Sequence, residues 1–186
     1  MTPKFYVVDT NVLLVAALPQ HEKHPARRAA IDWLENFGRD SQSILIVDYV
    51  SPPGHSAQLY LRPQFLPHIP FGTPNSRILS EYHNKLHTTH TYMQIIRAKI
   101  DDPSQNVVVY VDYSGRFAVL DSSIKSRVDP GDVKFVMAAI NFITHHVMGP
   151  RFRPTIVYAD DVADWLACRH ELENDYHINF LHLGAH

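Results

Sequence analysis

Carboxylate side chains gather where the sequence predicts the ends of strands and the starts of helices. Asp9 closes a short β-prone run at residues 4–8, and more acids follow a similar run at residues 155–158. A single carboxylate at a helix start is usually a cap or a favourable partner of the helix dipole. Several without compensating Lys or Arg are costly unless a hard divalent cation binds among them. The acids in question are Asp9, Glu81, Asp132, Asp160, Asp161 and Asp164.

Strand-like and helix-like segments alternate along the chain and are expected to position these acids. The β-prone runs are residues 4–8, 43–47, 155–158 and 178–183. Apolar residues with a helical period occur around residue 12 and at 24–37, 76–100, 135–147 and 164–172. This alternation predicts an α/β fold with a parallel sheet covered on both faces. Ligand sites in such sheets lie beyond the carboxyl ends of the strands, which is where the acids occur.

The chain has 186 residues and is predicted to form one domain, residues 1–186, with two insertions. The first insertion is placed at about residues 49–75, because six of the 13 prolines lie between Pro52 and Pro74. This density of proline excludes a helix or a central strand. We therefore expect an ordered loop there.

The second predicted insertion covers about residues 104–124. Its β-rich runs, 107–113 and 116–120, flank the turn-forming pair Ser114 and Gly115. Two such runs separated by a short turn are typical of a β-hairpin. The sequence therefore predicts a hairpin added to the main sheet.

Several blocks of this sequence, taken in order, resemble the PIN-domain nuclease family, which includes the VapC-type toxin ribonucleases. The first block is the run VVDTNVLL at residues 7–14. The further blocks are WLE at 33–35, ILSEY at 78–82, DPGDVKFV at 129–136, DVADW at 161–165 and HINF at 177–180. Asp-Thr-Asn alone is a weak motif, whereas ordered blocks at plausible element boundaries are more specific.

The resemblance implies a PIN-like three-layer α/β/α sandwich with a central, mainly parallel sheet. It also implies a metal-dependent nuclease with a catalytic acidic quartet, and its members here are Asp9, Glu81, Asp132 and Asp164. Asp161 stands where relatives often have another polar or acidic residue, so the fourth role is open among Asp160, Asp161 and Asp164.

Supporting residues are also implied by the resemblance. Thr10 and Asn11 match polar positions that orient the first acid and its cluster. Many relatives have Asp-Pro-Asp-Asp where this chain has Gly131, which leaves Asp129 and Asp132 as the acids of that turn. The predicted hairpin has no counterpart in compact toxins of the family, so the substrate is not expected to be simply equivalent.

The chemistry expected of such a site is phosphodiester hydrolysis with Mg²⁺ or Mn²⁺. A divalent ion lowers the pKa of bound water, and a second one can steady the leaving oxygen. Asp9 and Asp164 are assigned to direct metal coordination, Asp132 to direct or water-mediated coordination, and Asp161 is a further candidate ligand. Glu81 is assigned to orient or deprotonate the attacking water. The resemblance implies products with a 5′-phosphate and a 3′-hydroxyl.

Basic residues near the predicted helix at 135–147 are candidates for binding the substrate's phosphates. Ordinary surface solvation is the default interpretation for such residues. Lys134, Arg151 and Arg153 are the sharper candidates, because they flank the helix that follows Asp132. A separate set, His83, His87 and His90, is spaced for one helical face; exposed or RNA-facing histidines are favoured over a zinc site, for which further ligands are missing.

The composition of the chain limits the classes of protein to which it can belong. The 17 basic and 19 acidic residues give a net charge of −2, without the basic excess of simple nucleic-acid binders. If four acids form a metal pocket, the remainder carries a small positive excess, so an RNA substrate stays compatible with the charge. The single cysteine excludes an internal disulfide framework, and no apolar run approaches a membrane span. A cytoplasmic protein is expected.

The leading hypothesis is a Mg²⁺/Mn²⁺-dependent endoribonuclease acting on RNA, with a toxin role, an antitoxin partner and a homodimer as open expectations. An aspartyl-phosphate phosphatase also uses an Asp at the end of its first strand, but it usually has a second acid where this chain has Asn11. A third hypothesis is a non-catalytic PIN-like scaffold that binds RNA or a protein. Retention of the acids favours the enzyme.

Overall fold

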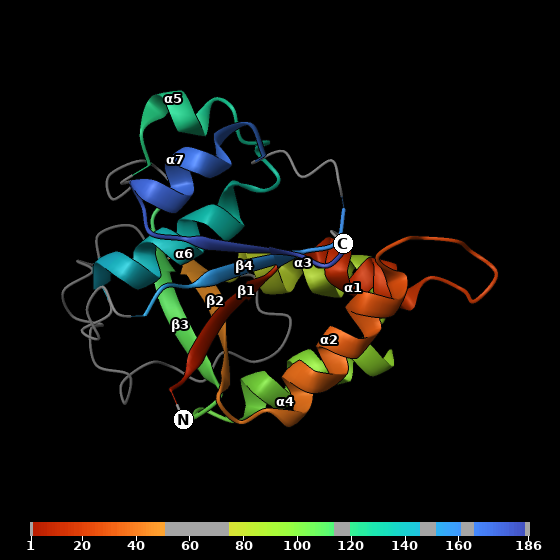
Figure 1. Cartoon of the computed structure of the whole chain (residues 1–186). Helices are drawn as coiled ribbons and strands as arrows, with labels where there is room; N and C mark the ends of the chain where they lie inside the picture. Colours follow the sequence, from red (N-terminus) through yellow and green to blue (C-terminus); the bar gives the residue numbers. More distant parts are fainter. Residues whose placement is uncertain (1, 51–74, 114–119, 146–151, 161–165, 185–186) are drawn as a thin grey trace.

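Five parallel strands form the central sheet of the computed structural model, in the order β3-β2-β1-β4-β5 (Figure 1). The structure describes residues 2–50, 75–113, 120–145, 152–160 and 166–184. The strands are β1 (Lys4–Val8), β2 (Ser43–Val50), β3 (Asn106–Val111), β4 (Thr155–Tyr158) and β5 (Asn179–His182). Every neighbouring pair is parallel.

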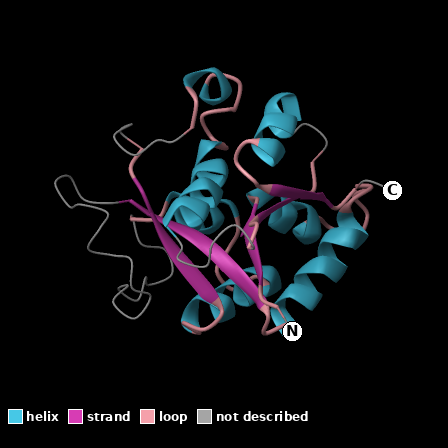
Figure 2. Cartoon of the chain, turned by 60° about the vertical axis from the view of Figure 1, so that its left-hand side comes forward, coloured by secondary structure: helices cyan, strands magenta, loops and turns pink. Residues whose placement is uncertain are grey.

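Helices occupy most of the connections between these strands (Figure 2). They are α1 (Thr10–Ala17), α2 (Arg27–Arg39), α3 (Arg77–Lys85), α4 (Thr91–Asp101), α5 (Ser122–Lys125), α6 (Val133–His145) and α7 (Arg169–Asn174), with a 3₁₀ turn, η3 (Leu166–Cys168). None of the helices within these described ranges is long and apolar enough to cross a membrane.

Side chains along β1 alternate between the two faces of the sheet, and those on each face pack against a helix. Phe5 points to one face, where its ring centroid lies 4.7 Å from that of Phe142 in α6. Tyr6 points to the other face and packs edge-on against Trp33 of α2, with 5.5 Å between ring centroids. Successive residues of a strand face opposite sides. The predicted α/β class is therefore confirmed, and the arrangement is consistent with three α/β/α layers.

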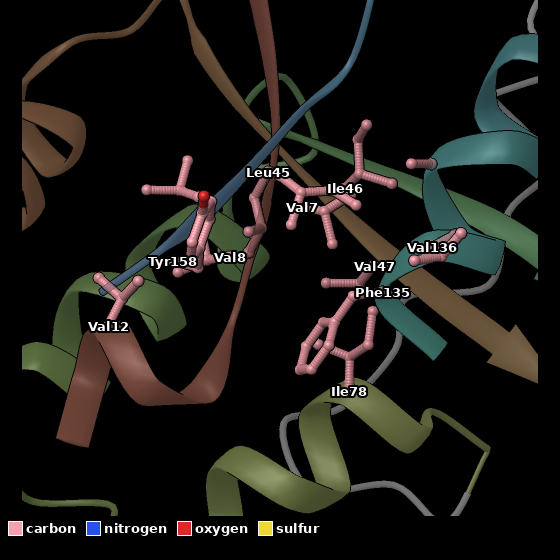
Figure 3. Close-up of a cluster of buried hydrophobic side chains, with 14 of the residues drawn as sticks. Val7, Val8, Val12, Leu45, Ile46, Val47, Ile78, Phe135, Val136 and Tyr158 are labelled. Carbon is pink, nitrogen blue, oxygen red and sulfur yellow. The ribbon is translucent and has the colours of Figure 1, made fainter. Parts of the chain in front are cut away.

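The core lies between the sheet and these helix layers. Val7 and its β2 neighbour Ile46 are fully buried on the side of the sheet that faces α6 (Figure 3). Figure 3 also shows Ile78 of α3 beside Phe135 of α6, which agrees with the contact between these two helices. Because α3 and α6 carry Glu81 and Lys134, this apolar contact brings charged residues from distant parts of the sequence together.

The strand order reverses between β1 and β4, and such a reversal is where open parallel sheets bind their ligands. The chain leaves β1 through α1 and α2 to reach β2, whereas it enters β4 from α6 on the other face. Connections that leave two adjacent strands toward opposite faces open a crevice at the strands' carboxyl ends. Asp9 follows β1 at that point.

One sequence prediction differs from the structure, and a second lies outside the described residues. Residues 106–111 form β3, which pairs in parallel with β2 and so belongs to the main sheet. The interpretation of this run as part of an added hairpin was incomplete for that reason, and its second arm at 116–119 lies outside the described residues. The predicted proline-rich insertion also lies outside them, at residues 51–74.

The single helical face predicted for three histidines is wrong. Helix α3 ends at Lys85, so only His83 belongs to it. His87 lies in the connection, and His90 is the N-cap of α4, where its ring accepts a hydrogen bond from the amide of Tyr92. A cap and a break separate the two helices, so the three histidines do not share one helical face.

Lys99 of α4 ties the loops at the amino ends of β2 and β3 to the helix layer. Its side chain is buried, and Nζ donates to the carbonyl oxygens of Asp40 (2.8 Å) and Ser43 (2.9 Å) and to Oε1 of Gln105 (2.7 Å). Burial lowers the pKa of Lys99, with Asp40 and Asp102 opposing that shift. Three acceptors thus offset the desolvation of one ammonium group.

We predict that Lys99→Met lowers the free energy of unfolding by roughly 1–3 kcal/mol, because it leaves buried acceptors without a donor. Urea denaturation measures the change. Arg97→Met on the same helix is the matched control, since Arg97 is paired with Asp101 in an exposed ion pair at 3.5 Å. Equal effects of the two substitutions would contradict the anchoring role of Lys99.

Candidate functional site

Asp9 occupies the junction between the carboxyl ends of β1 and β4. Its backbone N–H donates to the carbonyl oxygen of Val157 at 2.9 Å, which joins the two strand ends. Asp9 is also the N-cap of α1, as the sequence predicted. Only 4% of its surface is exposed. The first acid of the predicted quartet is therefore a buried carboxylate at the reversal of strand order.

Asn11 holds both carboxylate oxygens of Asp9. Its backbone N–H donates to Oδ1 (2.9 Å) and its side-chain Nδ2 donates to Oδ2 (3.0 Å). The Asn11 Oδ1 accepts from the backbone N–H of Ala159 after β4, at 2.9 Å. The contact expected between Asn11 and the first acid is thus confirmed. Thr10 beside it is buried, and its Oγ1 has no hydrogen-bond partner among the described residues.

Helix α3 brings Glu81 toward this junction. The neighbouring Tyr82 is fully buried, and its hydroxyl donates to the carbonyl oxygen of Val8, the last residue of β1. Burial raises the pKa of Tyr82 well above its usual value, and the charges of Asp9 and Glu81 raise it further. The hydroxyl therefore remains protonated and fixes α3 against the end of β1.

Asp48 anchors the start of α3 and was missed by sequence reasoning. It is fully buried in β2, and its oxygens accept from Ser76 Oγ (2.8 Å) and from the backbone N–H groups of Arg77 (2.9 Å) and Ile78 (3.0 Å). The Tyr113 hydroxyl donates to the same carboxylate at 2.9 Å. A carboxylate at a helix N-terminus satisfies otherwise unpaired N–H groups and complements the dipole.

The turn before α6 presents Asp132. Asp129 is exposed and shapes this turn: its Oδ1 accepts from the Gly131 N–H at 2.6 Å, and its carbonyl oxygen accepts from the Asp132 N–H at 2.8 Å. A Cβ at position 131 would stand 2.9 Å from Asp129 Oδ1, so glycine permits this close approach. Asp129 therefore has a supporting role in shaping the turn, and Asp132 is the partly buried acid.

Lys134, in the first turn of α6, pairs with Glu81. Its Nζ lies 2.5 Å from Glu81 Oε2, and it also donates to the carbonyl oxygen of Gly131. The side chain is only 7% exposed. Lys134 was predicted to contact substrate phosphates, but in this arrangement it faces an internal carboxylate instead of solvent.

The electrostatics of Asp9 connect it with two other predicted acids. The pKa of Asp9 is raised to about 8, mainly by burial; the charges of Asp132 and Glu81 contribute to the rise, whereas the Asn11 hydrogen bond and Lys134 oppose it. The carboxylates of Glu81 in α3 and of Asp132 in the turn before α6 therefore lie within electrostatic reach of Asp9 at the end of β1.

The remaining predicted residues are not all in this site. Asp161, Asp164 and Arg151 lie outside the described residues, and Asp160 is exposed after β4. The position of Arg153 after the α6 sequence predicted a place beside the acids. In the structure Arg153 does not lie there. It precedes β4 at the amino edge of the sheet, where it lines a cavity of about 290 Å³ with Lys4. The length of β1 separates this edge from Asp9, about 15 Å of strand.

The donor chemistry of the site suits a hard divalent cation. Asp9 and Asp132 offer carboxylate oxygens, which Mg²⁺ and Mn²⁺ prefer. A cation there would also favour ionisation of Asp9, whose charged form is otherwise suppressed by burial. Within the described ranges, no group of three or more His, Cys, Asp or Glu side chains is placed to hold a metal ion. The oxygen ligands therefore fit the ion, but they do not form a complete preassembled set.

Comparison of the chain with protein-family models, with curated protein sequences and with solved structures gave no match.

We predict that the metal-free protein loses stability as the pH rises from about 4 to 8. The pKa of Asp9 is about 8 in the folded chain, whereas the ordinary value for an aspartate, which applies to the unfolded chain, is 3.8. Between these two values the folded chain binds a proton at Asp9 that the unfolded chain has lost. The contribution of Asp9 is fully present at low pH and is lost progressively, by up to about 1.4 kcal/mol for each pH unit.

Urea denaturation in EDTA across this interval measures the slope. Asp9→Asn retains a capping side chain and is expected to show a shallower slope than the wild type. The comparison uses the pH dependence of the free energy of unfolding and not its absolute value. The amide introduced by Asp9→Asn also changes the contact with Asn11, which alters the stability itself. Parallel pH profiles for the two proteins would contradict a raised pKa at Asp9.

We predict that Asp48→Ala lowers the free energy of unfolding by roughly 2–4 kcal/mol, because buried donors lose a charged acceptor. Amide hydrogen exchange at Arg77 and Ile78 should accelerate with it. Asp101→Ala is the control, because Asp101 is exposed on α4. Unchanged protection of the two amides would show that Asp48 does not anchor α3.

Proposed function

We propose that the chain is a Mg²⁺- or Mn²⁺-dependent endoribonuclease with a PIN-like fold. The observation that carries the proposal is the buried Asp9 carboxylate, which lies within electrostatic reach of Glu81 and Asp132 at the carboxyl end of β1, where the strand order reverses. Burying one carboxylate within reach of two others is unfavourable unless it serves a ligand of opposite charge. The resemblance of the blocks around these residues to PIN-domain nucleases supports the same activity.

The chain's own residues have distinct roles in this proposal. Asp9 and Asp132 hold the cation, together with Asp164 as the resemblance implies. Asn11 fixes both oxygens of Asp9, so this ligand needs little reorganisation. A divalent cation bound there supplies positive charge to the phosphodiester and activates the attacking water.

Glu81 has a different role, because its carboxylate is held by Lys134 on the α6 side of the site. We assign it to orient the attacking water and to accept its proton. At 29% exposure, the Glu81 side chain retains access to solvent while Asp9 is almost fully buried. The difference in exposure supports a division between a cation ligand and a water-orienting acid.

A non-catalytic PIN-like scaffold is the second candidate function. One observation favours it: an internal ammonium already neutralises Glu81, and the described acids do not form a complete metal-holding group. Such a scaffold would bind RNA or a protein without cleaving it. The toxin role, the antitoxin partner and the homodimer remain predictions from the sequence resemblance.

We predict that the purified protein cleaves RNA with Mg²⁺ or Mn²⁺ and is inactive in EDTA. Asp9→Asn and Asp132→Asn should each reduce the cleavage rate by ~100-fold or more, since each removes charge that stabilises the cation. Single-stranded and structured RNA are compared by gel electrophoresis. Asp101→Asn is the control, because Asp101 lies on exposed surface of α4.

Three outcomes separate the candidates. Cleavage that persists in EDTA, or in both variants, contradicts the metal-dependent mechanism. RNA binding by the wild type without cleavage favours the scaffold. Loss of cleavage in Asp101→Asn would indicate that the assay reports general instability and not the acidic site.

A further inference from the structure

We propose that Arg77, which stacks on the ring of Tyr113, binds a backbone phosphate of the RNA next to the bond that is cut. The inference rests on the proposed function and deepens it, because it names a residue that contacts the substrate. This arginine takes the part that the sequence had assigned to Lys134, which the structure instead pairs with Glu81.

The side chain of Arg77 is held by a support that is itself anchored. Its Cζ lies 3.8 Å from the centroid of the Tyr113 ring. The Tyr113 hydroxyl donates to Oδ2 of Asp48 at 2.9 Å, and the backbone N–H of Arg77 donates to the same oxygen at 2.9 Å. Asp48 is fully buried. One internal carboxylate therefore fixes both the ring and the backbone of the arginine that stacks on it.

The stack lowers the entropic cost of contacting a ligand. A freely moving arginine side chain loses rotamer freedom when it binds. Tyr113 already restricts Arg77, and the pKa of Tyr113 is raised, mainly by burial, so its hydroxyl remains protonated and keeps its hydrogen bond to Asp48. Stacking uses the face of the guanidinium, whereas its N–H groups lie in the plane. They remain available to the oxygens of a phosphate.

The charge of Arg77 is not taken up by the part of the chain that the structure describes. Its side chain is exposed and forms no ion pair or hydrogen bond with any described residue. Glu81, the carboxylate one turn further along α3, is paired with Lys134. Asp48 and Ser76 already accept from backbone N–H groups in the first turn of α3. The guanidinium is therefore the donor that an anion would meet here.

The stack lies at the same edge of the sheet as the acidic site. Tyr113 follows β3, and the N–H of Val50 at the end of β2 donates to the carbonyl oxygen of Asn75, just before α3, at 2.5 Å. The next strand is β1, about 5 Å from β2. Arg77 and Glu81 are four residues apart, so they share one side of α3 and are separated by about 6 Å along its axis. An RNA strand whose cut bond lies at Glu81 can therefore place a neighbouring phosphate at Arg77.

The test measures RNA affinity separately from cleavage. Metal-free protein in EDTA is titrated into a labelled single-stranded RNA of about 12 nucleotides, and fluorescence anisotropy gives Kd at several salt concentrations. Arg77→Met keeps an unbranched side chain against Tyr113 but removes the charge, so it should raise Kd roughly 10-fold. It should also reduce the slope of log affinity against log salt concentration by about 0.7, the amount expected for one phosphate contact on a single strand.

Cleavage assays with Mg²⁺ give a second readout. Arg77→Met should raise KM by a factor similar to the change in Kd and alter kcat little, because a phosphate beside the cut bond is held equally in the ground state and the transition state. A purely structural role of Arg77 would lower the melting temperature and leave the salt dependence of binding unchanged.

Matched variants make the test specific. Arg77→Lys keeps the charge without the planar fork, so it should keep the salt slope and give an intermediate Kd. Tyr113→Leu removes the supporting ring and should weaken binding while the salt slope stays near that of the wild type, as expected of a positioning residue. Arg39→Met is the control, since Arg39 is exposed at the end of α2, before β2 begins, and is paired with Glu35. If Arg77→Met does not fold by circular dichroism, Arg77→Gln takes its place.

The outcomes distinguish the inference from the function on which it rests. If the wild type neither binds nor cleaves RNA, both fail. If the wild type cleaves RNA but Arg77→Met leaves Kd, KM and the salt slope unchanged, only the inference is overturned. If Arg77→Met weakens binding as expected but the wild type does not cleave with either metal, the phosphate contact is supported and the nuclease function is overturned.

Discussion

The burial of the Asp9 carboxylate is the constraint on which the candidate site depends. A charge in this position loses the solvation of water, and two nearby acids make its ionisation still less favourable. Hydrogen bonds from Asn11 offset part of this effect, and the link from Asn11 to Ala159 joins the same network to the end of β4. The junction of the two central strands therefore holds a carboxylate at the expense of stability, an arrangement typical of sites that bind a cation or perform chemistry.

The other two acids reach Asp9 through helices that are fixed at their first turns. Asp48 holds the N-terminus of α3, and Tyr82 joins the next turn of this helix to the end of β1. Asp129 organises the turn before α6. Each helix is therefore positioned by hydrogen bonds within about one turn of the acid or lysine that it contributes. Hydrogen bonds this close to the acid or lysine restrict the position of its side chain more than packing alone does.

Local patterns in the sequence were sufficient to predict the first and fourth strands, the cap at Asp9 and the helix that begins near Asp132. These features depend on residues that are adjacent in sequence. Asp48 was not predicted, because its partners at Ser76 and beyond follow a proline-rich stretch and no local signal joins the two segments. The place of β3 in the main sheet was missed for a related reason: a β-rich run indicates a strand but not its neighbour, and the Ser-Gly turn favoured a local pairing.

Lys134 shows why the chemistry of a site is harder to derive from sequence than its acids are. Helical periodicity gave no reason to bury a lysine in the first turn of α6, so solvent exposure was the natural expectation. The structure instead places the ammonium against Glu81 and within electrostatic reach of Asp9. The overall balance of 17 basic and 19 acidic residues conceals this arrangement. Charges averaged over the whole chain are a weak guide to its ligand, because the decisive charges lie on α3, α6 and the end of β1 and meet only after folding.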